Sequence, residues 1–384
     1  MTKTPMTLDI DTRRTEHSRI AEIDWNHLPF GRIYSDHMMM MDFRGGAWQK
    51  PAIVPFGPVS LHPGNATLHY GQSIFEGMKA IRGHDGRITL FRPELNARRF
   101  NESCQRLCMP GIPEDTFIEL VKAHARFERD WVPANDNAAL YLRPFIFATD
   151  EALGVRPSET YKFMILSCPA GAYYAEPLSV KIEERYTRAA EGGVGRAKTA
   201  GNYAASLLPT KLANDEGFQQ LIWTDGKEHK YIEESGTMNV VFVIDGTLIT
   251  PSEDSDTILR SVVKRSVVDL AKHWGIPVQE RRISVEEVIA AIREGRLDDA
   301  FGAGTAATIA PIARIGFRGE IFDLPPVAGR VVSKRIKTYL DGIKHGAIPD
   351  ELGWCGEICS AVSSRPAPRR VCPRAPAPNA CAVI

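Results

Sequence analysis

The stretch Gly192-Gly-Val-Gly-Arg-Ala-Lys198-Thr199-Ala-Gly-Asn-Tyr203 is decisive, because its lysine has two chemical interpretations that belong to different folds. In the first, residues 192–199 form a phosphate-binding P-loop, G-x-x-x-x-G-K-[ST], of a nucleotide hydrolase. Ala197 stands where that loop requires glycine, and a Cβ there obstructs the backbone amides that wrap a phosphate. In the second, Lys198 is a Schiff-base lysine, and the small residues beside it let a flat ring approach the backbone. A solvated loop lysine also fits the spacing, so the rest of the chain must decide.

Length and composition limit the class of protein. The chain has 384 residues, 43% of them hydrophobic, with 47 Lys and Arg against 47 Asp and Glu. At roughly 150 residues per domain, this length predicts two or three domains. The zero net charge offers no basic excess to a nucleic acid, and no apolar run reaches the about 18 residues of a membrane span. The seven cysteines and a start without a secretory apolar core predict reduced thiols in the cytoplasm.

Turn and helix signals divide the chain into two α+β domains, which we expect at residues 1–167 and 175–352 with a linker at 168–174. Asp-Gly pairs at Asp85 and Asp245 predict two β-hairpins. Apolar spacing and Ser, Pro and Gly boundary signals predict helices. The expected helices cover residues 93–107, 114–131, 203–216, 261–274 and 285–294. Residues 353–384 carry four Arg and one Glu among many Pro and Ala, and we expect a disordered extension there.

Three stretches before Lys198 and three after it must be considered together with this lysine. They are YGQSIFEGMK (70–79), LFRPELNARR (90–99), LYLRP (140–144), GNY (201–203), EESGTMN (233–239) and FGAGTA (301–306). From about Trp25 to Ile343 the chain resembles the branched-chain amino-acid aminotransferases, fold-type IV enzymes that use pyridoxal 5'-phosphate. The resemblance implies the two-domain α+β architecture of these enzymes, with the large C-terminal domain binding the cofactor.

The implied reaction is transamination of leucine, isoleucine or valine with 2-oxoglutarate, which gives the branched-chain 2-oxo acid and L-glutamate. A D-amino-acid aminotransferase and an aminodeoxychorismate lyase share the fold, the lysine and the glutamate. Tyr141-x-Arg143 and the sequence Phe75-Glu-Gly favour the branched-chain enzyme. The P-loop nucleotide hydrolase stays a remote alternative.

The resemblance also assigns the cofactor residues. Lys198 matches the lysine that holds the cofactor and moves a proton. Tyr203 matches the hydroxyl at the cofactor's O3′, and Glu234, chosen over Glu233 by the Glu-x-Gly-Thr-Met-Asn frame, matches the carboxylate at the pyridine nitrogen. The remaining cofactor contacts are expected from Arg99, Thr237, Thr305 and the backbone amides of Val262 and Val263 at a helix N-terminus. Arg98 points about 100° away from Arg99 on a helix, so only one of them can face inward.

Substrate contacts are expected from an apolar pocket and a carboxylate site. Tyr141 and Arg143 lie two apart on a predicted strand, so both side chains leave the same face. By resemblance, the pocket is lined by Tyr70, Phe75, Tyr141 and Tyr173, and the carboxylate is held by Arg143 and the amides of Thr305 and Ala306. The family often contributes Tyr70 across a subunit interface, which implies a homodimer.

Three features differ from relatives or stay open. The Cys-x-x-Cys pair that some relatives carry is Ala307 and Ala310 here, and the histidine spacing predicts no metal site. The usual Leu-Pro-Gly before the 261–274 helix is Leu-Arg-Ser. The end of the chain, Cys381-Ala-Val-Ile384, matches a prenylation box, and Cys355-x-x-x-Cys359 could form a thiol pair, although an unstructured extension explains both.

Overall fold

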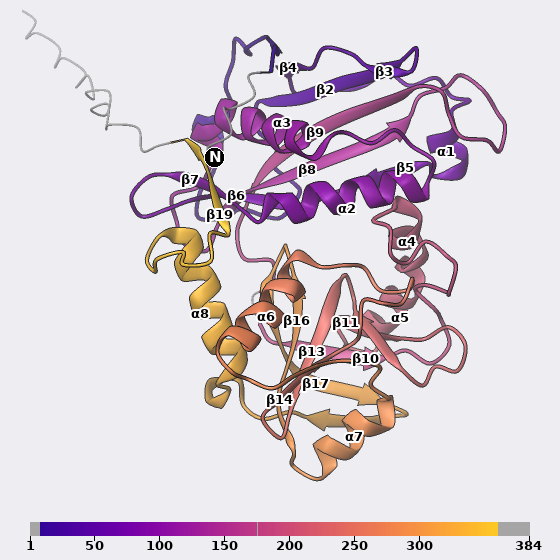
Figure 1. Ribbon diagram of the computed structural model, residues 1–384, viewed down its shortest axis with the longest axis vertical. Coiled ribbons are helices and arrows are strands. Elements are labelled where there is room, and N and C mark those ends of the chain that lie inside the picture. The colour runs from indigo at the N-terminus through magenta and orange to yellow at the C-terminus, as the bar shows by residue number, and fades with distance from the viewer. Residues whose placement is uncertain (1–7, 175, 360–384) are drawn as a thin grey trace, which may run out of the picture.

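The computed structural model describes residues 8–174 and 176–359, which form two lobes (Figure 1). The N-terminal lobe is built on one sheet with the strand order β1-β4-β2-β9-β8-β6-β7-β19, while β3 pairs with β2 and β5 with β8. Its strands are β1 (Asp11–Thr12), β2 (His37–Arg44), β3 (Ala47–Trp48), β4 (Ala52–Pro55), β5 (Ser73–Phe75), β6 (Met78–Arg82), β7 (Ile88–Phe91), β8 (Ala139–Ala148), β9 (Tyr161–Ala170) and β19 (Cys355–Cys359).

The C-terminal lobe contains a second sheet with the order β12-β11-β10-β17-β16-β13-β14-β15. Strand β12 also pairs with β13, so the sheet closes on itself from β12 round to β13. Its strands are β10 (Leu178–Ile182), β11 (Gln220–Thr224), β12 (Ile232–Ser235), β13 (Met238–Ile244), β14 (Thr247–Thr250), β15 (Val278–Glu280), β16 (Leu297–Gly304), β17 (Thr308–Phe317) and β18 (Glu320–Asp323). The mixture of helices and strands in two units confirms the α+β fold class.

Both Asp-Gly hairpins are confirmed. Strands β6 and β7 pair antiparallel across Asp85-Gly86, and β13 and β14 pair antiparallel across Asp245-Gly246. At the second turn both residues have positive φ, 48° for Asp245 and 71° for Gly246, which is the conformation that a tight hairpin requires.

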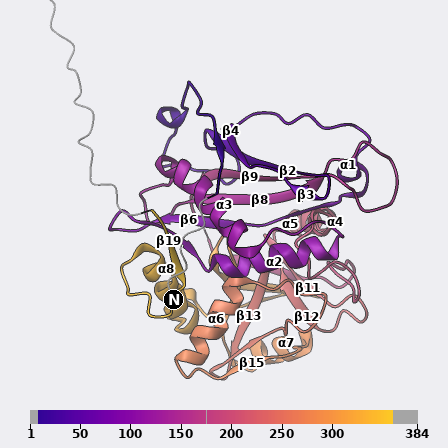
Figure 2. The same ribbon diagram turned by 45° about the horizontal axis from the view of Figure 1, so that its top comes forward.

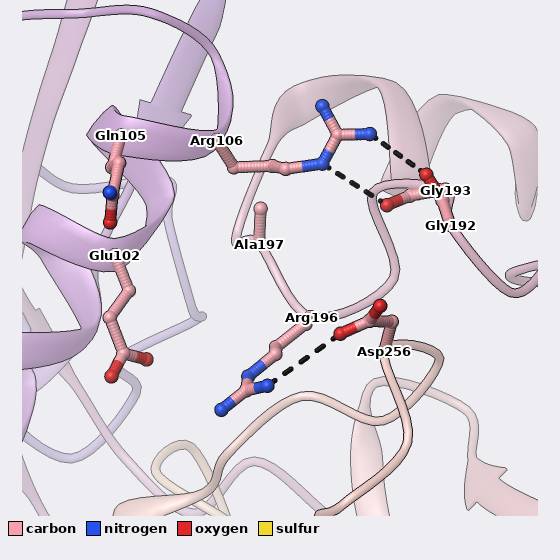
Figure 3. Close-up of a pocket in the computed structure, with 8 residues that line it drawn as sticks. All are labelled: Glu102, Gln105, Arg106, Gly192, Gly193, Arg196, Ala197 and Asp256. Carbon is pink, nitrogen blue, oxygen red and sulfur yellow. Dashed lines mark hydrogen bonds and ion pairs between the residues drawn. The ribbon is translucent and has the colours of Figure 1, made fainter.

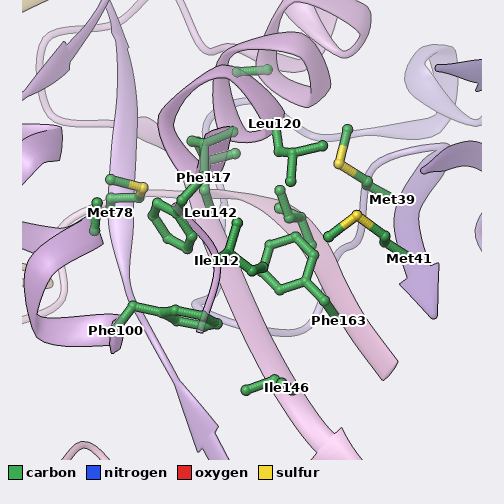
Figure 4. Close-up of a cluster of buried hydrophobic side chains, with 14 of the residues drawn as sticks. Met39, Met41, Met78, Phe100, Ile112, Phe117, Leu120, Leu142, Ile146 and Phe163 are labelled. Atoms are coloured by element: carbon green, nitrogen blue, oxygen red, sulfur yellow. The ribbon is translucent and has the colours of Figure 1, made fainter. Parts of the chain in front are cut away.

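Helices α2 (Pro93–Arg106) and α3 (Glu114–Phe127) bury an aromatic cluster against the N-terminal sheet. Phe100 of α2 lies 4.8 Å from Phe117 of α3 and 5.7 Å from Phe163 of β9, measured between ring centroids (Figure 4). All three side chains are fully buried. Because these large apolar rings are removed from water, they fix α2 on the sheet, with its other side toward the C-terminal lobe (Figures 1 and 2).

Helix α6 (Val262–His273) begins as the sequence predicts, because the Ser261 side chain accepts a hydrogen bond from the Lys264 amide. Helix α7 (Val285–Arg293) is likewise confirmed. The helix expected over 203–216 instead begins at residue 200 and is divided at Ser206 into α4 (Ala200–Ala205) and α5 (Leu207–Asp215). Helix α1 (Ala66–Tyr70) completes the N-terminal lobe.

The chain crosses between the lobes twice. It first leaves the N-terminal sheet after β9 and enters the C-terminal sheet at β10, so the crossing falls between residues 170 and 178. Helix α8 (Val332–His345) then contacts β16 and β17 on one side and β6 and β7 on the other. After α8 the chain returns to the N-terminal sheet, where β19 pairs antiparallel with β7 (Figure 1).

Strand β19 differs from the disordered extension expected over 353–384. Its residues pair with β7 from Cys355 opposite Phe91 to Cys359 opposite Ile88, and the Ile358 side chain is buried in the N-terminal core. Cys355 and Cys359 are free thiols in this strand. The remainder of the expected extension, including the prenylation box at Cys381, lies outside the described residues.

Candidate active site

Lys198 lies directly before α4, and its backbone is held by the N-terminal lobe. Its carbonyl accepts a hydrogen bond from the Phe75 amide at 3.0 Å, and its amide donates to the Ser103 hydroxyl of α2 at 2.9 Å. Thr199 extends this contact by pairing with Ile74 of β5. The lysine therefore belongs to the C-terminal lobe in sequence but takes its position from both lobes.

The Lys198 amine meets two of the aromatic residues expected at the site. Its Nζ donates to the Tyr203 hydroxyl at 2.6 Å and lies 4.6 Å from the centroid of the Phe75 ring. The Phe75 and Tyr203 rings are 4.8 Å apart. Five residues separate Lys198 from Tyr203, and the first turn of α4 brings the two side chains together. The structure thus joins three residues that the sequence placed in the same site.

Glu234 lies on β12 and is 3% exposed. Its Oε1 accepts a hydrogen bond from the Leu259 amide at 2.7 Å and forms an ion pair with Arg188 Nη2 at 3.0 Å. Burial raises the pKa of Glu234, although the positive charges of Arg188 and Lys198 oppose the rise. The carboxylate is therefore held in an almost dry site, where a nearby proton-bearing nitrogen interacts with it strongly.

The neighbouring Glu233 points to the other face of the strand, as alternation along β12 requires. Its Oε1 accepts a hydrogen bond from the Thr257 hydroxyl at 2.5 Å, and it lines a separate cavity of about 750 Å³. Since the charge of Lys198 acts on Glu234, the geometry agrees with the choice of Glu234 over Glu233. Arg188, the ion-pair partner, has no motif around it and was missed by the sequence reasoning.

Arg99 is buried on α2 and faces inward, whereas the side chain of Arg98 is 59% exposed. The guanidinium of Arg99 binds Glu76 with two hydrogen bonds, from Nε to Oε1 at 2.7 Å and from Nη2 to Oε2 at 2.8 Å. Its Nη1 donates to the carbonyl of Arg260 at 2.7 Å, just before α6. Sequence reasoning missed Glu76, although it lies within the FEG sequence after β5.

The N-terminus of α6 faces a small cavity of about 30 Å³. Val262, Val263 and Thr305 line it together with Asn96, so three of the expected phosphate contacts share one space. The first amides of a helix have no partner within the helix and attract anions. Arg99 also lies at this end of the site, because its guanidinium donates to the Arg260 carbonyl just before α6. The guanidinium of Arg99, the Thr305 hydroxyl and the first amides of α6 are donors that fit a phosphate group.

Two lysines that the sequence analysis did not single out support the loop after β16. Lys79 Nζ donates to the Ala306 carbonyl at 2.6 Å, and Lys344 Nζ lies 3.4 Å from the Thr308 hydroxyl. Burial, with the nearby charge of Lys344, lowers the pKa of Lys79 to about 8. Gly302 and Gly304 of β16 pack closely on Met238 of β13, because a Cβ at either glycine would meet the Met238 side chain at 2.6 or 2.9 Å.

Tyr141 and Arg143 leave the same face of β8, as predicted. Arg143 Nη2 donates to the Tyr141 hydroxyl at 3.0 Å, and its guanidinium carbon lies 4.5 Å from the centroid of the Phe75 ring. Arg143 Nε is buried and, within the described part of the chain, has no hydrogen-bond partner. A half-buried cation with a free, buried donor, which shares the Phe75 ring with Lys198, fits a site for a carboxylate.

Close packing around Tyr141 needs a residue without a side chain. A Cβ at Gly77 would lie 2.1 Å from the Tyr141 hydroxyl oxygen. The Tyr141 ring also packs edge-on against Phe30 at 4.8 Å, and Phe30 packs against Tyr173 at 5.1 Å. Phe30 was missed because nothing in the sequence around it marks it as a contact of residues more than 100 positions away.

Two expected residues stay apart from this cluster. Tyr70 is 47% exposed at the end of α1, with its ring 6.1 Å from that of His69. Thr237 is exposed in the turn between β12 and β13, whereas the adjacent strand residues are buried. The single chain therefore gives no inward position to either side chain.

The glycine-rich loop does not have the arrangement of a P-loop. Arg106 donates to the carbonyls of Gly192 and Gly193 at 3.0 and 3.3 Å, beside a cavity of about 600 Å³ (Figure 3). Asn202 Nδ2 donates to the carbonyls of Val194 and Ala197. The loop thus presents carbonyl oxygens to cationic and amide donors, where a phosphate would require amides.

Comparison with known proteins identifies the family of this chain. The family model described as amino-transferase class IV matches residues 73–315. Branched-chain-amino-acid aminotransferase 2 of Bacillus subtilis is 42% identical over 89% of this chain and 95% of its own length. The probable branched-chain-amino-acid aminotransferase of Staphylococcus aureus (strain N315) is 43% identical over 86% of this chain and 93% of its own.

Solved structures agree with this result. The branched-chain amino acid aminotransferase from Escherichia coli matches with a TM-score of 0.66 at 27% identity, covering 84% of this chain and 99% of that one. The T.th. branched-chain amino acid aminotransferase with pyridoxamine 5'-phosphate matches with a TM-score of 0.67 at 25% identity, covering 83% of this chain and 98% of that one.

Among the described residues, no helix is both long and apolar enough to cross a membrane.

Proposed function

Since this chain belongs to the class IV aminotransferases, we propose that it catalyses the reversible transfer of an amino group from leucine, isoleucine or valine to 2-oxoglutarate. The observation that carries the proposal is the meeting of the Lys198 amine with the Tyr203 hydroxyl at 2.6 Å in a site that also contains buried Glu234. The curated relatives named above as branched-chain aminotransferases favour this substrate class over the D-amino-acid and lyase alternatives.

The residues present fit pyridoxal 5'-phosphate. Lys198 would hold it covalently, Tyr203 would bind its O3′, and the phosphate would lie among Arg99, Thr305 and the first amides of α6. Thr237 remains an expected contact. When bound, the cofactor supplies an electrophilic carbon for the substrate amine and a ring that accepts electrons.

Each catalytic side chain then has a defined task. Lys198 Nζ would act as the base that takes the proton from the substrate Cα and as the acid that returns a proton later in the reaction. Tyr203 keeps that amine in place through its hydrogen bond. Glu234, whose carboxylate forms an ion pair with Arg188, would face the pyridine nitrogen and favour its protonated form. These groups lie in a largely buried site, so their charges interact more strongly than they would in water.

Substrate binding follows from the face of β8. The Arg143 guanidinium, with its free Nε, and the amides of Thr305 and Ala306 would hold the substrate carboxylate. Phe75, Tyr141 and Tyr173 would surround the aliphatic side chain, with Phe30 filling the space behind the two tyrosines.

A homodimer would complete the pocket with Tyr70 of the second copy. Exposed apolar side chains support this assembly, because they are found on α1 (Leu68 and Tyr70) and on α5 (Leu207 and Leu208), which lie on the same side of the molecule (Figures 1 and 2). Light scattering should give the mass of two chains for the wild type, and the double variant Leu207→Asp, Leu208→Asp should be a monomer.

The free cysteines are in keeping with a cytoplasmic enzyme.

The decisive test combines a spectrum with chemical trapping. The purified protein should absorb visible light, and reduction with borohydride should place the cofactor on Lys198 by peptide mapping. A protein that stays colourless after incubation with the cofactor, or a label on another lysine, would overturn the mechanism. Assays with D- and L-amino acids then separate the branched-chain activity from the alternatives.

A further inference from the structure

Three potential metal ligands from distant parts of the chain meet on the surface. His84 lies in the turn between β6 and β7, Asp136 lies in the loop before β8, and His345 is the last residue of α8. One ligand atom from each lies within 4.8 Å of the others. His84 Nε2 and Asp136 Oδ1 are already 2.9 Å apart, and the two imidazole rings are stacked at 5.8 Å. Sequence spacing could not reveal this group, because its members are 52 and 209 residues apart from one another.

The tautomer of His345 is fixed by its surroundings. Its Nδ1 lies 3.2 Å from the backbone carbonyl of Arg82, and because a carbonyl only accepts, Nδ1 carries the proton. The Nε2 lone pair of the neutral ring is therefore available. This use of one ring nitrogen for a backbone carbonyl is the usual arrangement of metal-bound histidines.

The backbone brings the ligand residues together before any ion binds. The His84 amide donates to the His345 carbonyl at 2.9 Å, so two ligand positions are directly joined. The side chains of His84 and Asp136 are 54% and 65% exposed, which leaves them free to move. Tetrahedral zinc with bonds of about 2.0–2.2 Å needs ligand atoms roughly 3.4 Å apart, a small closure from the present separation.

Two cations of the β6–β7 turn and of α8 are engaged by other carboxylates. Arg87 Nε is bound to Asp85 at 2.6 Å, and Lys337 Nζ is bound to Asp341 at 2.5 Å. The Asp136 carboxylate has only the His84 imidazole as its ion-pair partner among the described residues. A divalent cation would replace the hydrogen bond between His84 Nε2 and Asp136 Oδ1.

We propose that His84, Asp136 and His345 form a binding site for one divalent transition-metal ion of the zinc class, with water completing the coordination. Two imidazoles and a carboxylate are ligands that zinc accepts. The ion joins the end of α8 to the β6–β7 turn and to the loop before β8. It therefore fastens the C-terminal lobe to the N-terminal sheet at a point separate from Lys198 and its neighbours.

The test is zinc binding by the full-length, tag-free protein after chelator treatment. Calorimetric titration with zinc chloride should give one site per chain that is lost or weakened at least about tenfold in His84→Ala, Asp136→Ala and His345→Ala. His273→Ala, which removes an exposed histidine of α6, should bind as the wild type does. Zinc should also raise the melting temperature of the wild type and of His273→Ala, but not of the three ligand variants.

Cobalt(II) distinguishes this site from binding by cysteines. A histidine and carboxylate site gives only weak visible bands, whereas thiolate ligands add an intense near-ultraviolet charge-transfer band. Circular dichroism in the presence of chelator checks that each variant is folded, and Asp136→Ala, at the most exposed position, is the least disturbing change. The proposal is overturned if the wild type binds no zinc, if Asp136→Ala binds it unchanged, or if cobalt reports thiolate ligation.

Discussion

Replacing Glu76 by glutamine should lower the free energy of unfolding of the cofactor-free protein far more than the loss of an ion pair at the protein surface does. Glu76 is fully buried and Arg99 is 6% exposed, so neither charge has access to water. In Glu76→Gln the new amide can still accept one hydrogen bond from Arg99, but its NH2 group opposes the second guanidinium donor. A buried guanidinium is then left without a compensating charge, which costs about 3–5 kcal/mol.

The pKa of Glu76 determines how the loss of stability in Glu76→Gln should vary with pH. Burial acts to raise the pKa of Glu76, but the charges of Arg99 and Lys198 and the hydrogen bonds prevail, and the pKa is lowered. The stability that the ionised group contributes is therefore fully present above the ordinary glutamate pKa of about 4.3. It is lost as the pH falls through the lower pKa of the folded protein. The difference in unfolding free energy between wild type and Glu76→Gln should stay constant from neutral pH down to about 4.3. It should shrink as the pH falls further, through the lower pKa that Glu76 has in the folded protein.

Urea unfolding followed by circular dichroism measures the effect. The matched control is Glu320→Gln, which removes a carboxylate whose distance to Arg293 is similar, 2.6 Å, but whose side chain is 54% exposed. That control should cost at most about 1 kcal/mol. A loss of less than about 1 kcal/mol in Glu76→Gln, or a loss equal to that of the control, would refute the argument from burial.

Four further substitutions test the site. Lys198→Ala should lower the turnover of leucine by at least about 10³-fold while the protein stays folded, and ordinary turnover would contradict the role of the lysine. Glu234→Gln should slow the reaction by about 100-fold and Glu233→Gln only slightly. Equal effects of the two changes in a glutamate-release assay would contradict the assignment of Glu234 alone to the face of β12 that meets the site. Gly77→Ala should displace the Tyr141 hydroxyl and lower kcat/KM by about tenfold or more; an unchanged kcat/KM would show that the tyrosine can move without cost.

Local features of the fold could be predicted from the sequence because their causes are local. The Asp-Gly turns and the Ser261 cap each follow from a few neighbouring residues. Helix geometry indicates only that one of Arg98 and Arg99 faces inward, and the family resemblance selects Arg99. The break at Ser206 also has a local cause, because Pro209 lacks an N–H and therefore lies in the first turn of α5; the expectation of one helix over 203–216 overlooked this residue. Strand β19 was missed because its pairing with β7 depends on a partner more than 260 residues away.

The candidate site shows the same division. Lys198, Tyr203 and Glu234 could be assigned because they lie in conspicuous stretches that match a family. Arg188, Glu76 and Phe30 escaped notice because each acts through a contact that only the folded chain creates. The sequence also suggested inward roles for Tyr70 and Thr237 that a single chain does not provide.

Because the chain returns to the N-terminal sheet through α8 and β19, the two lobes cannot be separated by a single cut between them. A protease that cuts between residues 170 and 178 leaves two fragments that still share a sheet, since the outer strand of the N-terminal lobe is carried by the C-terminal fragment. An isolated fragment ending at Ala170 would expose the free edge of β7 and invite aggregation. Shortened versions of this chain should therefore keep everything through Cys359, and the two halves, expressed as separate polypeptides, should assemble by returning that strand to its place.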